Sequence, residues 1–402
     1  MLEFQEALAR VLAAVPVPTG ESVSLNDAPG RVLAEPIQSP IDLPIFDNSS
    51  MDGYAVRATD VALADPTSPV RLRLAGKVAA GEVFPGEVTA GTCVRLFTGS
   101  PLPPGANAVV MQEDTRVESN APGEVLILNQ AQPGENVRPH GEDVRRGSLL
   151  AEAAQVLGVG RIGLLAAAGL THVHVGRQPV VGLLATGSEL TEPGRPLEPG
   201  RIYENNRAVL AALIRRAGAV PKVYPLVPDA LAGTSLALAD AFHECDAVVT
   251  SGGVSVGEMD FLKCAFEQIG GSLEFWKAAI KPGRPFAFGR LWGKLLFGLP
   301  GNPVSALVTF LLLVRPALLR WQGATDVSLP AHPGVLAEPL VNHGERRHFI
   351  RVKVDSAGMV RSTGIQASHV LSSVAAANGL VDVPADTTLA AGSQVTVLRW
   401  EY

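Results

Sequence analysis

Three segments decide the fold: PVVGLLATGSE (179–189), DAVVTSGGVSVGEMD (246–260) and LLFGLPGNPVS (295–305). In each segment a short run of Val, Leu, Ala or Phe is followed at once by a turn that contains glycine. A short apolar run bounded by such turns is typical of a buried strand. The stretches between these three segments contain patterns that predict helices of ten or more residues. Strands that alternate with such helices predict right-handed crossovers and an α/β domain with a doubly wound, mainly parallel sheet.

The rest of the chain predicts further domains around this α/β part, since 402 residues exceed what a single core usually organises. Residues 45–139 are dense in Pro and Gly with short apolar runs, which predicts a β-rich inserted domain. Residues 1–44 and 140–176 flank it and are expected to form one discontinuous N-terminal domain. Residues 177–323 are the α/β domain. Short strand-like runs such as RHFIRVKV and QVTVLRW predict a small C-terminal β domain over 324–402.

The composition excludes several classes of protein. Hydrophobic residues make up 47% and charged residues 18% of the chain, which is typical of a globular protein. The formal net charge of -6 provides no general attraction to nucleic acid, so we expect no nucleic-acid partner. The three cysteines, Cys93, Cys245 and Cys264, form no CxxC pair. They therefore support neither a disulfide framework nor a zinc knuckle, and they suit a reducing compartment.

Two apolar segments bear on membrane association. The N-terminal stretch 1–15 places Glu3 and Glu6 where a secretory signal would carry positive charge, and its apolar residues are spaced like an amphipathic helix. The most apolar run, 306–319, is interrupted by an Arg-Pro pair and is shorter than the roughly 20 residues that a membrane span needs. We therefore expect a retained N-terminal helix, a buried helix at 306–319, and a cytoplasmic protein that no membrane anchors.

The glycine-rich turns are candidates for binding an anion. Each is expected at the carboxyl end of a strand, where ligands of open α/β sheets bind and where free backbone amides face the ligand. A single turn of this kind is more often plain loop, whereas three on one sheet edge favour a phosphate site. No turn matches a Walker loop or the GxGxxG fingerprint. The candidate binding residues in these turns are Ser251, Gly252, Gly253, Ser255, Gly257, Pro300, Gly301 and Asn302.

A basic segment, FWKAAIKPGRPFAFG (275–289), holds Lys277, Lys281 and Arg284 on a backbone stiffened by Pro and Gly. Cations among apolar neighbours are costly unless they meet anions. One interpretation is ordinary surface ion pairing; the other is that these cations face the same anion as the glycine-rich turns.

Acidic residues form the other half of the candidate site. They lie in turns or at helix starts: Asp52, Asp143, Glu189, Asp229 and Asp260. A carboxylate in such a place often caps a helix. Beside a phosphate-binding turn it can instead hold Mg²⁺, which typically takes one or two carboxylates plus substrate oxygens. The sequence contains no HExxH motif and suggests no Ser-His-Asp arrangement, so a hydrolytic nucleophile has no support.

Several long motifs, in matching order, resemble the molybdopterin molybdenumtransferase family, which includes the C-terminal domain of gephyrin. These motifs are FDNSSMDGYAV, FTGSPLPPGANAVVMQED, RPHGEDV, TSGGVSVGEMD, WKAAIKPGRPFAFG and GLPGNPVSA. The resemblance covers essentially the whole chain. It implies an enzyme that binds adenylated molybdopterin and molybdate, breaks the link to AMP with Mg²⁺, and inserts molybdenum into the dithiolene.

The resemblance also assigns roles to residues. The implied catalytic residues are Asp52, Thr98, Asp143, Glu189, Lys277 and Lys281, and the implied metal ligands are Asp229 and Asp260. The glycine-rich turns and Arg284 would bind substrate, and Arg351 in FIRV and Ser368 in QASH would hold molybdate. The sequence departs from the family pattern at three places: Ser188 stands where the family often has Asp, Ala367 replaces a family glycine, and Asp229 lies in a weakly matching stretch.

The family architecture implies an elongated, four-domain homodimer. In such a dimer, Asp52 and Thr98 of one subunit approach the α/β cleft of the other. Proteins of cofactor biosynthesis and molybdoenzymes are the implied transfer partners. Two alternatives remain. A molybdopterin adenylyltransferase shares the TSGG and PGNP turns but has a single domain, and a non-catalytic scaffold of the same fold would lack acids or lysines that are present here. The main hypothesis predicts that Asp260→Ala or Lys281→Ala abolishes molybdenum insertion and leaves the fold intact.

Overall fold

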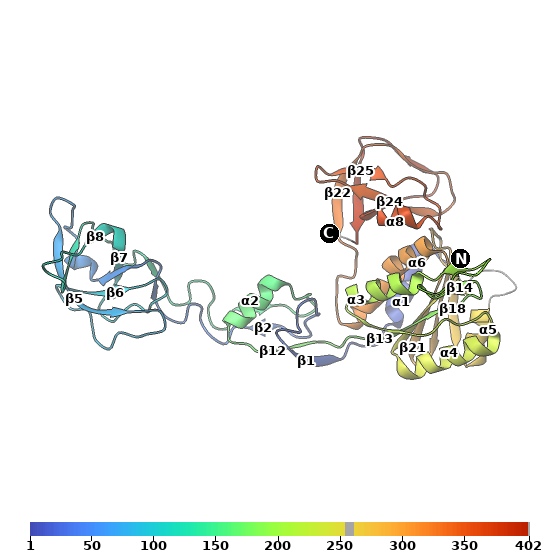
Figure 1. Ribbon diagram of the computed structural model, residues 1–402, viewed down its shortest axis with the longest axis horizontal. Helices are drawn as coiled ribbons and strands as arrows, with labels where there is room; N and C mark the ends of the chain where they lie inside the picture. Colours follow the sequence, from blue (N-terminus) through green and yellow to red (C-terminus); the bar gives the residue numbers. More distant parts are fainter. Residues whose placement is uncertain (254–260, 401–402) are drawn as a thin grey trace.

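A computed structural model describes residues 1–253 and 261–400 and shows an elongated molecule (Figure 1). A β-rich lobe lies at one end and the α/β domain at the other, joined through a small middle lobe. The C-terminal β domain sits against the α/β domain, so both labelled chain ends lie at the same end of the molecule (Figure 1).

The α/β domain is built on one twisted sheet with the strand order β16-β13-β17-β21-β20-β18. Its parallel strands are β13 (Val180–Ala185), β16 (Val220–Val223), β17 (Ala247–Ser251) and β21 (Lys294–Leu299). Two antiparallel strands extend it, β20 (Pro285–Leu291) and β18 (Ser272–Lys277). Strand β17 is buried along its whole length, as expected for a parallel strand covered on both faces. The predicted mainly parallel, doubly wound sheet is confirmed.

Helices cover both faces of this sheet. One face carries α1 (Phe4–Ala14), α3 (Asn206–Arg216), α6 (Pro303–Thr309) and α7 (Arg315–Trp321), whose apolar residues form one core with the sheet. The other face carries α4 (Leu231–Glu244) and α5 (Phe261–Gln268). Each face of the sheet therefore has its own apolar core.

The apolar run expected as a buried helix continues further than its sequence indicates. A π-helical turn, η3 (Phe310–Val314), joins α6 to α7, so that Pro303–Trp321 is one helix of 19 residues. A π turn inserts extra backbone into a helix, which accommodates Pro316 without ending it. The expectation that this run is too short to span a membrane was therefore wrong. Burial decides instead, because 83% of its apolar window lies inside the fold and marks it as a core helix.

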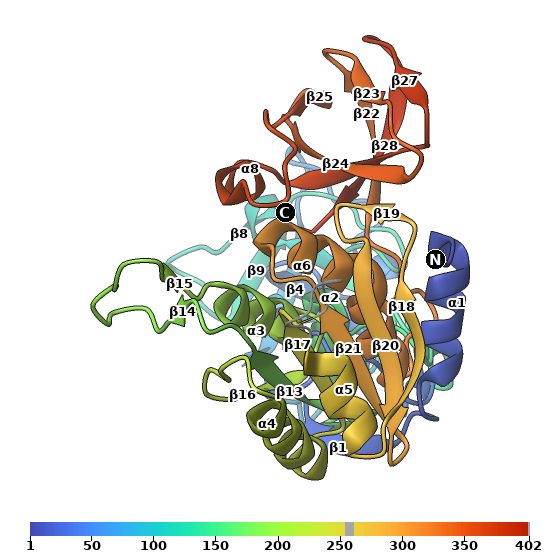
Figure 2. The same ribbon diagram turned by 90° about the vertical axis from the view of Figure 1, so that its right-hand side faces the viewer.

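The N-terminal helix packs on the α/β domain and not on the middle lobe. Phe4, Ala7 and Val11 are buried in the α/β core, and the Phe4 ring meets Phe349 edge-on at 5.4 Å. Figure 2 shows α1 alongside β18. Residues 1–44 were predicted to form one domain with 140–176. The structure differs from this prediction at α1, which packs on the α/β domain.

The middle lobe is assembled from two separate parts of the chain. Strand β1 (Gly20–Ser24) pairs with β12 (His172–Gly176), and β2 (Ile37–Gln38) pairs with β11 (Leu149–Ala151). Helix α2 (Val159–Ala167) packs on them around a core that includes Leu33 and Leu165.

The β-rich lobe is a sheet of order β7-β4-β6-β5-β9-β8 with an apolar cluster on each side. Its strands are β4 (Gly53–Val56), β5 (Val70–Val78), β6 (Thr92–Leu96), β7 (Ala108–Met111), β8 (Thr115–Arg116) and β9 (Glu124–Ile127). Strands β3 (Asn48–Ser49) and β10 (Val137–Arg138) pair where the chain enters and leaves. The 3-10 turns η1 (Ala58–Asp60) and η2 (Gln112–Asp114) connect strands.

The C-terminal domain is a sheet that closes on itself, because β24 pairs with both β25 and β26. Its elements are β22 (Ala331–Leu336), β23 (Leu340–Asn342), β24 (Arg347–Val354), β25 (Met359–Ser362), α8 (Leu371–Ala375), β26 (Gly379–Val383), β27 (Thr387–Leu389) and β28 (Gln394–Arg399). The short β19 (Ile280–Lys281) from the basic segment adds in parallel to β24. This pairing joins the C-terminal domain to the α/β domain.

Candidate functional site

A cavity of about 700 Å³ opens where β13, β17 and β21 end. The turns after these three strands form its floor. A loop that carries β14 (Leu190–Thr191) and β15 (Ile202–Tyr203) forms one wall. The predicted site residues that line it are Glu189, Asp229, Ser251, Gly252, Gly253, Pro300, Gly301 and Asn302. The structure thus brings the three glycine-rich turns together, as the sequence predicts.

The glycines of the second turn are required by backbone geometry. Gly252 has φ +91° and Gly253 has φ +68°, values that residues with a Cβ rarely adopt. A Cβ on Gly252 would lie 2.5 Å from the carbonyl oxygen of Thr186. Gly301 is close enough that its Cβ would meet the Cα of Gly252 at 3.7 Å. The turns pack backbone to backbone, and the Gly252 N–H donates to the carbonyl oxygen of Leu299 at 3.1 Å.

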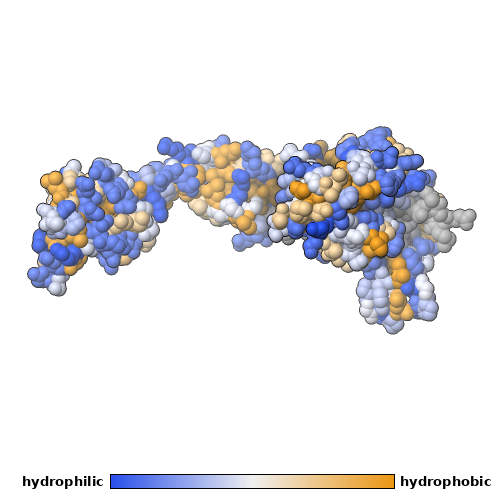
Figure 3. Space-filling model, turned by 90° about the horizontal axis from the view of Figure 1, so that it is seen from above, coloured by the Kyte–Doolittle hydropathy of each residue, from blue (hydrophilic) through white to orange (hydrophobic). Residues whose placement is uncertain are grey.

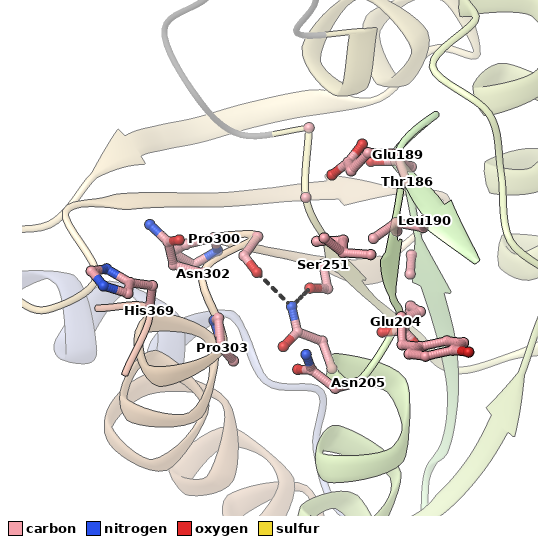
Figure 4. Close-up of a pocket in the computed structure, with 18 of the residues that line it drawn as sticks. Thr186, Glu189, Leu190, Glu204, Asn205, Ser251, Pro300, Asn302, Pro303 and His369 are labelled. Carbon is pink, nitrogen blue, oxygen red and sulfur yellow. Dashed lines mark hydrogen bonds between the residues drawn. The ribbon is translucent and has the colours of Figure 1, made fainter. Parts of the chain in front are cut away.

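Asn206 holds two of these turns together. Its side-chain N–H group donates to Ser251 Oγ and to the carbonyl oxygen of Gly301, both at 2.7 Å (Figure 4). Asn206 begins α3, so one side chain fixes a helix start and the turns after β17 and β21. No sequence motif singled out Asn206, although an Asn pair at a predicted helix start is a signal for such a role.

The cavity wall contains polar atoms without a protein partner. Within the described residues, Thr186 Oγ1 and Asn205 Oδ1 are buried and make no hydrogen bond. Most buried polar groups in folded proteins have a partner. Both atoms lie beneath the cavity surface, so a ligand reaches them only if the wall rearranges.

The carboxylates of the cavity differ in their surroundings. Asp229 accepts a hydrogen bond from the backbone N–H of Ser188 at 2.9 Å, and Glu189 lines the cavity beside it. Glu204, which no sequence motif singled out, is 5% exposed and is paired with Arg207 at 3.0 Å. Glu189 and Asp229 are thus available to a ligand, whereas Glu204 is already neutralised.

The basic segment reaches the cavity only through Pro285. Lys277 lines a second cavity, of about 490 Å³, beside Leu2 and the edge of β18. Lys281 lies in β19 against the C-terminal domain, and Arg284 is exposed on the following turn. None of these three cations is among the described residues that line the 700 Å³ cavity. Lys277 pairs with Pro285 across β18 and β20, so the segment borders the cavity at Pro285 and not through these cations.

Arg351 is a buried residue of the C-terminal domain and does not line the cavity. Its side chain is 0% exposed and donates to Ser373 Oγ and to the carbonyl oxygens of Ile365 and Ala367. Burial lowers the pKa of Arg351 to about 10, so the guanidinium stays charged at neutral pH. Nη1 has no partner within the described residues. Arg351 therefore holds the loop that carries Ser368, whose carbonyl oxygen accepts from the Val304 N–H at 3.2 Å.

Asp52 and Thr98 lie in the β-rich lobe, far from the cavity of the same chain (Figure 1). The backbone N–H and the hydroxyl of Thr98 donate to Asp52 Oδ1 at 2.8 and 3.0 Å. These bonds hold the pKa of the Asp52 carboxyl below its ordinary value, with a smaller contribution from Arg95. Asp143 is exposed in the middle lobe. The structure does not bring these three residues to the cavity within one chain, and Ser255, Gly257 and Asp260 lie outside the described residues.

Comparison with known proteins covers the chain from end to end. Residues 2–169 match the family described as the MoeA N-terminal region (domain I and II), 182–320 a probable molybdopterin binding domain, and 333–400 the MoeA C-terminal region (domain IV). The molybdopterin molybdenumtransferase of Haemophilus influenzae is 39% identical over 99% of this chain and 98% of its own length. The chain belongs to the molybdopterin molybdenumtransferase family.

Other relatives of this family agree. Molybdopterin molybdenumtransferase 2 of Mycobacterium tuberculosis is 40% identical over 98% of both chains. The crystal structure of the molybdopterin biosynthesis moeA protein from Pyrococcus horikoshii OT3 superposes with a TM-score of 0.83 at 32% identity and covers 100% of both chains. The family is enzymatic, so the chain is a transferase of molybdenum cofactor biosynthesis. Full-length similarity favours this assignment over the single-domain adenylyltransferase and the non-catalytic scaffold.

The cavity residues suit a magnesium ion if a bound substrate supplies some of the ligands. Over 1–253 and 261–400, no three His, Cys, Asp or Glu side chains gather as a metal site. Mg²⁺ usually keeps several waters and takes one or two carboxylates together with substrate oxygens. Glu189 and Asp229 supply that number at one cavity. The donor set therefore suits a magnesium ion that is bound together with a phosphorylated substrate.

Proposed function

We propose that this chain inserts molybdenum from molybdate into adenylated molybdopterin in a Mg²⁺-dependent reaction that releases AMP. The observation that carries the proposal is the convergence on one cavity of three glycine-rich turns and of two carboxylates, Glu189 and Asp229. Backbone donors suit the phosphate groups of such a substrate, and the exposed Ile202 and Tyr203 offer apolar surface to its ring systems.

The residues of the cavity have distinct proposed roles. Gly253, Gly301 and Asn302 position the phosphates through backbone and amide N–H groups, and Ser251, Gly252 and Pro300 form the surface on which the phosphates rest. Glu189 and Asp229 would hold Mg²⁺, which when bound neutralises charge on the phosphate oxygens of the bond that breaks. Ser255, Gly257 and Asp260 follow directly in sequence and are proposed to complete the binding turn and the metal site.

Residues outside the cavity are proposed to act on molybdate and at the subunit boundary. Arg351, Ser368 and Lys281 lie near the junction of the C-terminal and α/β domains, which suits an oxyanion such as molybdate. Lys277, Arg284 and Asp143 are proposed as further binding or catalytic groups on the strength of the family motifs. Lys281→Ala and Asp260→Ala are expected to abolish insertion without unfolding the protein.

A homodimer is proposed because one chain cannot join its own Asp52 and Thr98 to its own cavity. The middle lobe offers a surface for such a contact. Val159 is 84% exposed, and Val156 and Leu149 are more than half exposed. Figure 3 shows apolar side chains gathered on this part of the molecule. Apolar patches of this kind mark interaction surfaces. A cytoplasmic location and transfer of the product to other cofactor-biosynthesis proteins or molybdoenzymes complete the proposal.

The test is an assay of AMP release. Purified protein is supplied with adenylated molybdopterin and Mg²⁺, with and without molybdate. Release of AMP that requires molybdate and stops after chelation of Mg²⁺ supports the proposal. Accumulation of adenylated pterin from molybdopterin and ATP would instead show an adenylyltransferase.

A further inference from the structure

The cavity of the α/β domain is completed by a residue from a different domain. His369, in the loop before α8, lines the cavity together with Asn302 and Pro303. Figure 4 places its imidazole beside Asn302, on the opposite side of the cavity from Glu189 and Glu204. The side chain is exposed, and its ring hydrogen-bonds to no residue of the described chain. It is therefore free to meet a ligand.

The loop that carries His369 is fixed from two sides. On the α/β side, the N–H of Val304 donates to the carbonyl oxygen of Ser368 at 3.2 Å. On the C-terminal side, the buried guanidinium of Arg351 donates to the carbonyl oxygens of Ile365 and Ala367 at 3.1 and 3.2 Å. The imidazole thus projects into the cavity from a backbone that is held in place.

The charges around the cavity give His369 a distinct role. The described lining residues include Glu189, Glu204 and Asp229 but neither Lys nor Arg. His369 is the one residue among them whose side chain can carry a positive charge. Carboxylates at one side suit a metal ion, whereas the imidazole and the Asn302 amide at the other side suit an oxyanion. The cavity therefore has Glu189 on one side and the hydrogen-bonding groups of His369 and Asn302 on the other.

We infer that His369 binds a phosphoryl oxygen of the substrate, so that the C-terminal domain supplies part of the nucleotide-pterin site as well as any molybdate site. This inference rests on the proposed function. The ligand chemistry is a tetrahedral oxyanion that accepts a hydrogen bond from an imidazole N–H. Both phosphate and molybdate have this chemistry, and the cavity, shared with the phosphate-binding turns, favours phosphate.

Calorimetric titration of the full-length protein tests the inference with AMP, pyrophosphate and molybdate as separate probes. His369→Ala removes the donor, and His369→Gln keeps a side-chain N–H of similar reach. His332→Ala is the matched control, because His332 is exposed in the same domain and does not line the cavity. We expect His369→Ala to weaken AMP and pyrophosphate binding about ten-fold or more, and His369→Gln to restore most of it. His332→Ala should bind like the wild type.

Three results would overturn the inference: unchanged phosphate binding in His369→Ala, weakening of molybdate binding alone, or failure of the wild type to bind either phosphate probe. The proposed function is judged separately by molybdate-dependent AMP release in the wild type. If that assay fails while His369→Ala still loses phosphate affinity, the proposed reaction is wrong and the binding role of His369 stands.

Discussion

Ser188 and Asp229 hold each other by two reciprocal hydrogen bonds. The Ser188 N–H donates to Asp229 Oδ2 at 2.9 Å, and the Asp229 N–H donates to Ser188 Oγ at 3.1 Å. The pair joins the turn after β13 to the segment before α4, at the edge of the cavity. Ser188 stands where the family often has Asp, and its hydroxyl accepts the same kind of backbone bond that a carboxylate oxygen accepts.

Ser188→Ala should lower the turnover number about five-fold, because one of the two bonds that orient Asp229 is lost and a bond of this kind contributes roughly 1 kcal/mol. Ser188→Thr keeps the hydroxyl and serves as the control. The rate of molybdate-dependent AMP release measures both. Equal rates in the Ala and Thr variants would show that the pair does not orient a functional carboxylate.

Thr98→Val should raise the pKa of Asp52. The Thr98 N–H and then its hydroxyl keep that pKa below the ordinary value of 3.8. The stabilisation is complete above pH 3.8 and is lost as the pH falls through the lowered folded-state pKa. The variant loses only the hydroxyl contribution, so Asp52 becomes protonated at a higher pH, which carbon NMR titration of the carboxyl measures. Thr67→Val is the control, because Thr67 bonds Asp65 in the same lobe and should leave Asp52 unchanged.

Asp52→Ala and Glu189→Ala should each be inactive and should complement each other when mixed. In a two-fold dimer whose sites are shared, a mixed dimer has one intact site. Random exchange of subunits then restores about a quarter of wild-type activity. AMP release after unfolding and refolding of the two variants together measures the effect. Activity that stays at the level of either variant alone would argue against shared sites.

Arg207→Met should destabilise the α/β domain by about 3–5 kcal/mol, because it leaves the buried Glu204 without its partner. Arg207 is 6% exposed and also bonds Glu192 and the carbonyl oxygen of Tyr224. Urea unfolding measures the loss. Arg10→Met removes an exposed pair with Glu6 and should change the unfolding free energy by less than about 1 kcal/mol. Similar losses in the two variants would contradict the assigned role of burial.

His348→Leu should make the C-terminal domain less sensitive to acid. Burial lowers the pKa of His348 to about 4 from 6.5, with help from Lys281, Arg351 and Arg346. Between pH 6.5 and pH 4 the unfolded chain binds a proton at His348, whereas the folded chain leaves this side chain neutral. The free energy of unfolding therefore falls as the pH drops from 6.5 toward 4, by up to about 3 kcal/mol. Unfolding midpoints at pH 7 and pH 5 should differ less in His348→Leu than in the wild type or in the exposed control His332→Leu.

Much of the site could be predicted from the sequence because its determinants are local. The apolar runs before Thr186, Ser251 and Gly298 are buried strands, and Gly252 and Gly253 adopt backbone angles that only glycine takes readily. Once a parallel sheet is inferred, its topology places the ends of these strands at one edge. The convergence of the three turns follows from the residues themselves.

Other features depend on which elements pack together, and no local pattern encodes that. Lys277, Lys281 and Arg284 come just before Pro285, which lines the cavity, but none of the three lines it. His369 is far away in sequence and reaches the cavity only because the C-terminal domain docks on α6 and β19.

The sequence by itself determined the strands, the glycine turns and the family. The tertiary structure alone decided which charged side chains meet the cavity and that Asp52 lies too far away to join it within one chain. The physical reason is that backbone conformation is set by neighbouring residues, whereas the place of a side chain in a site is set by the docking of whole domains.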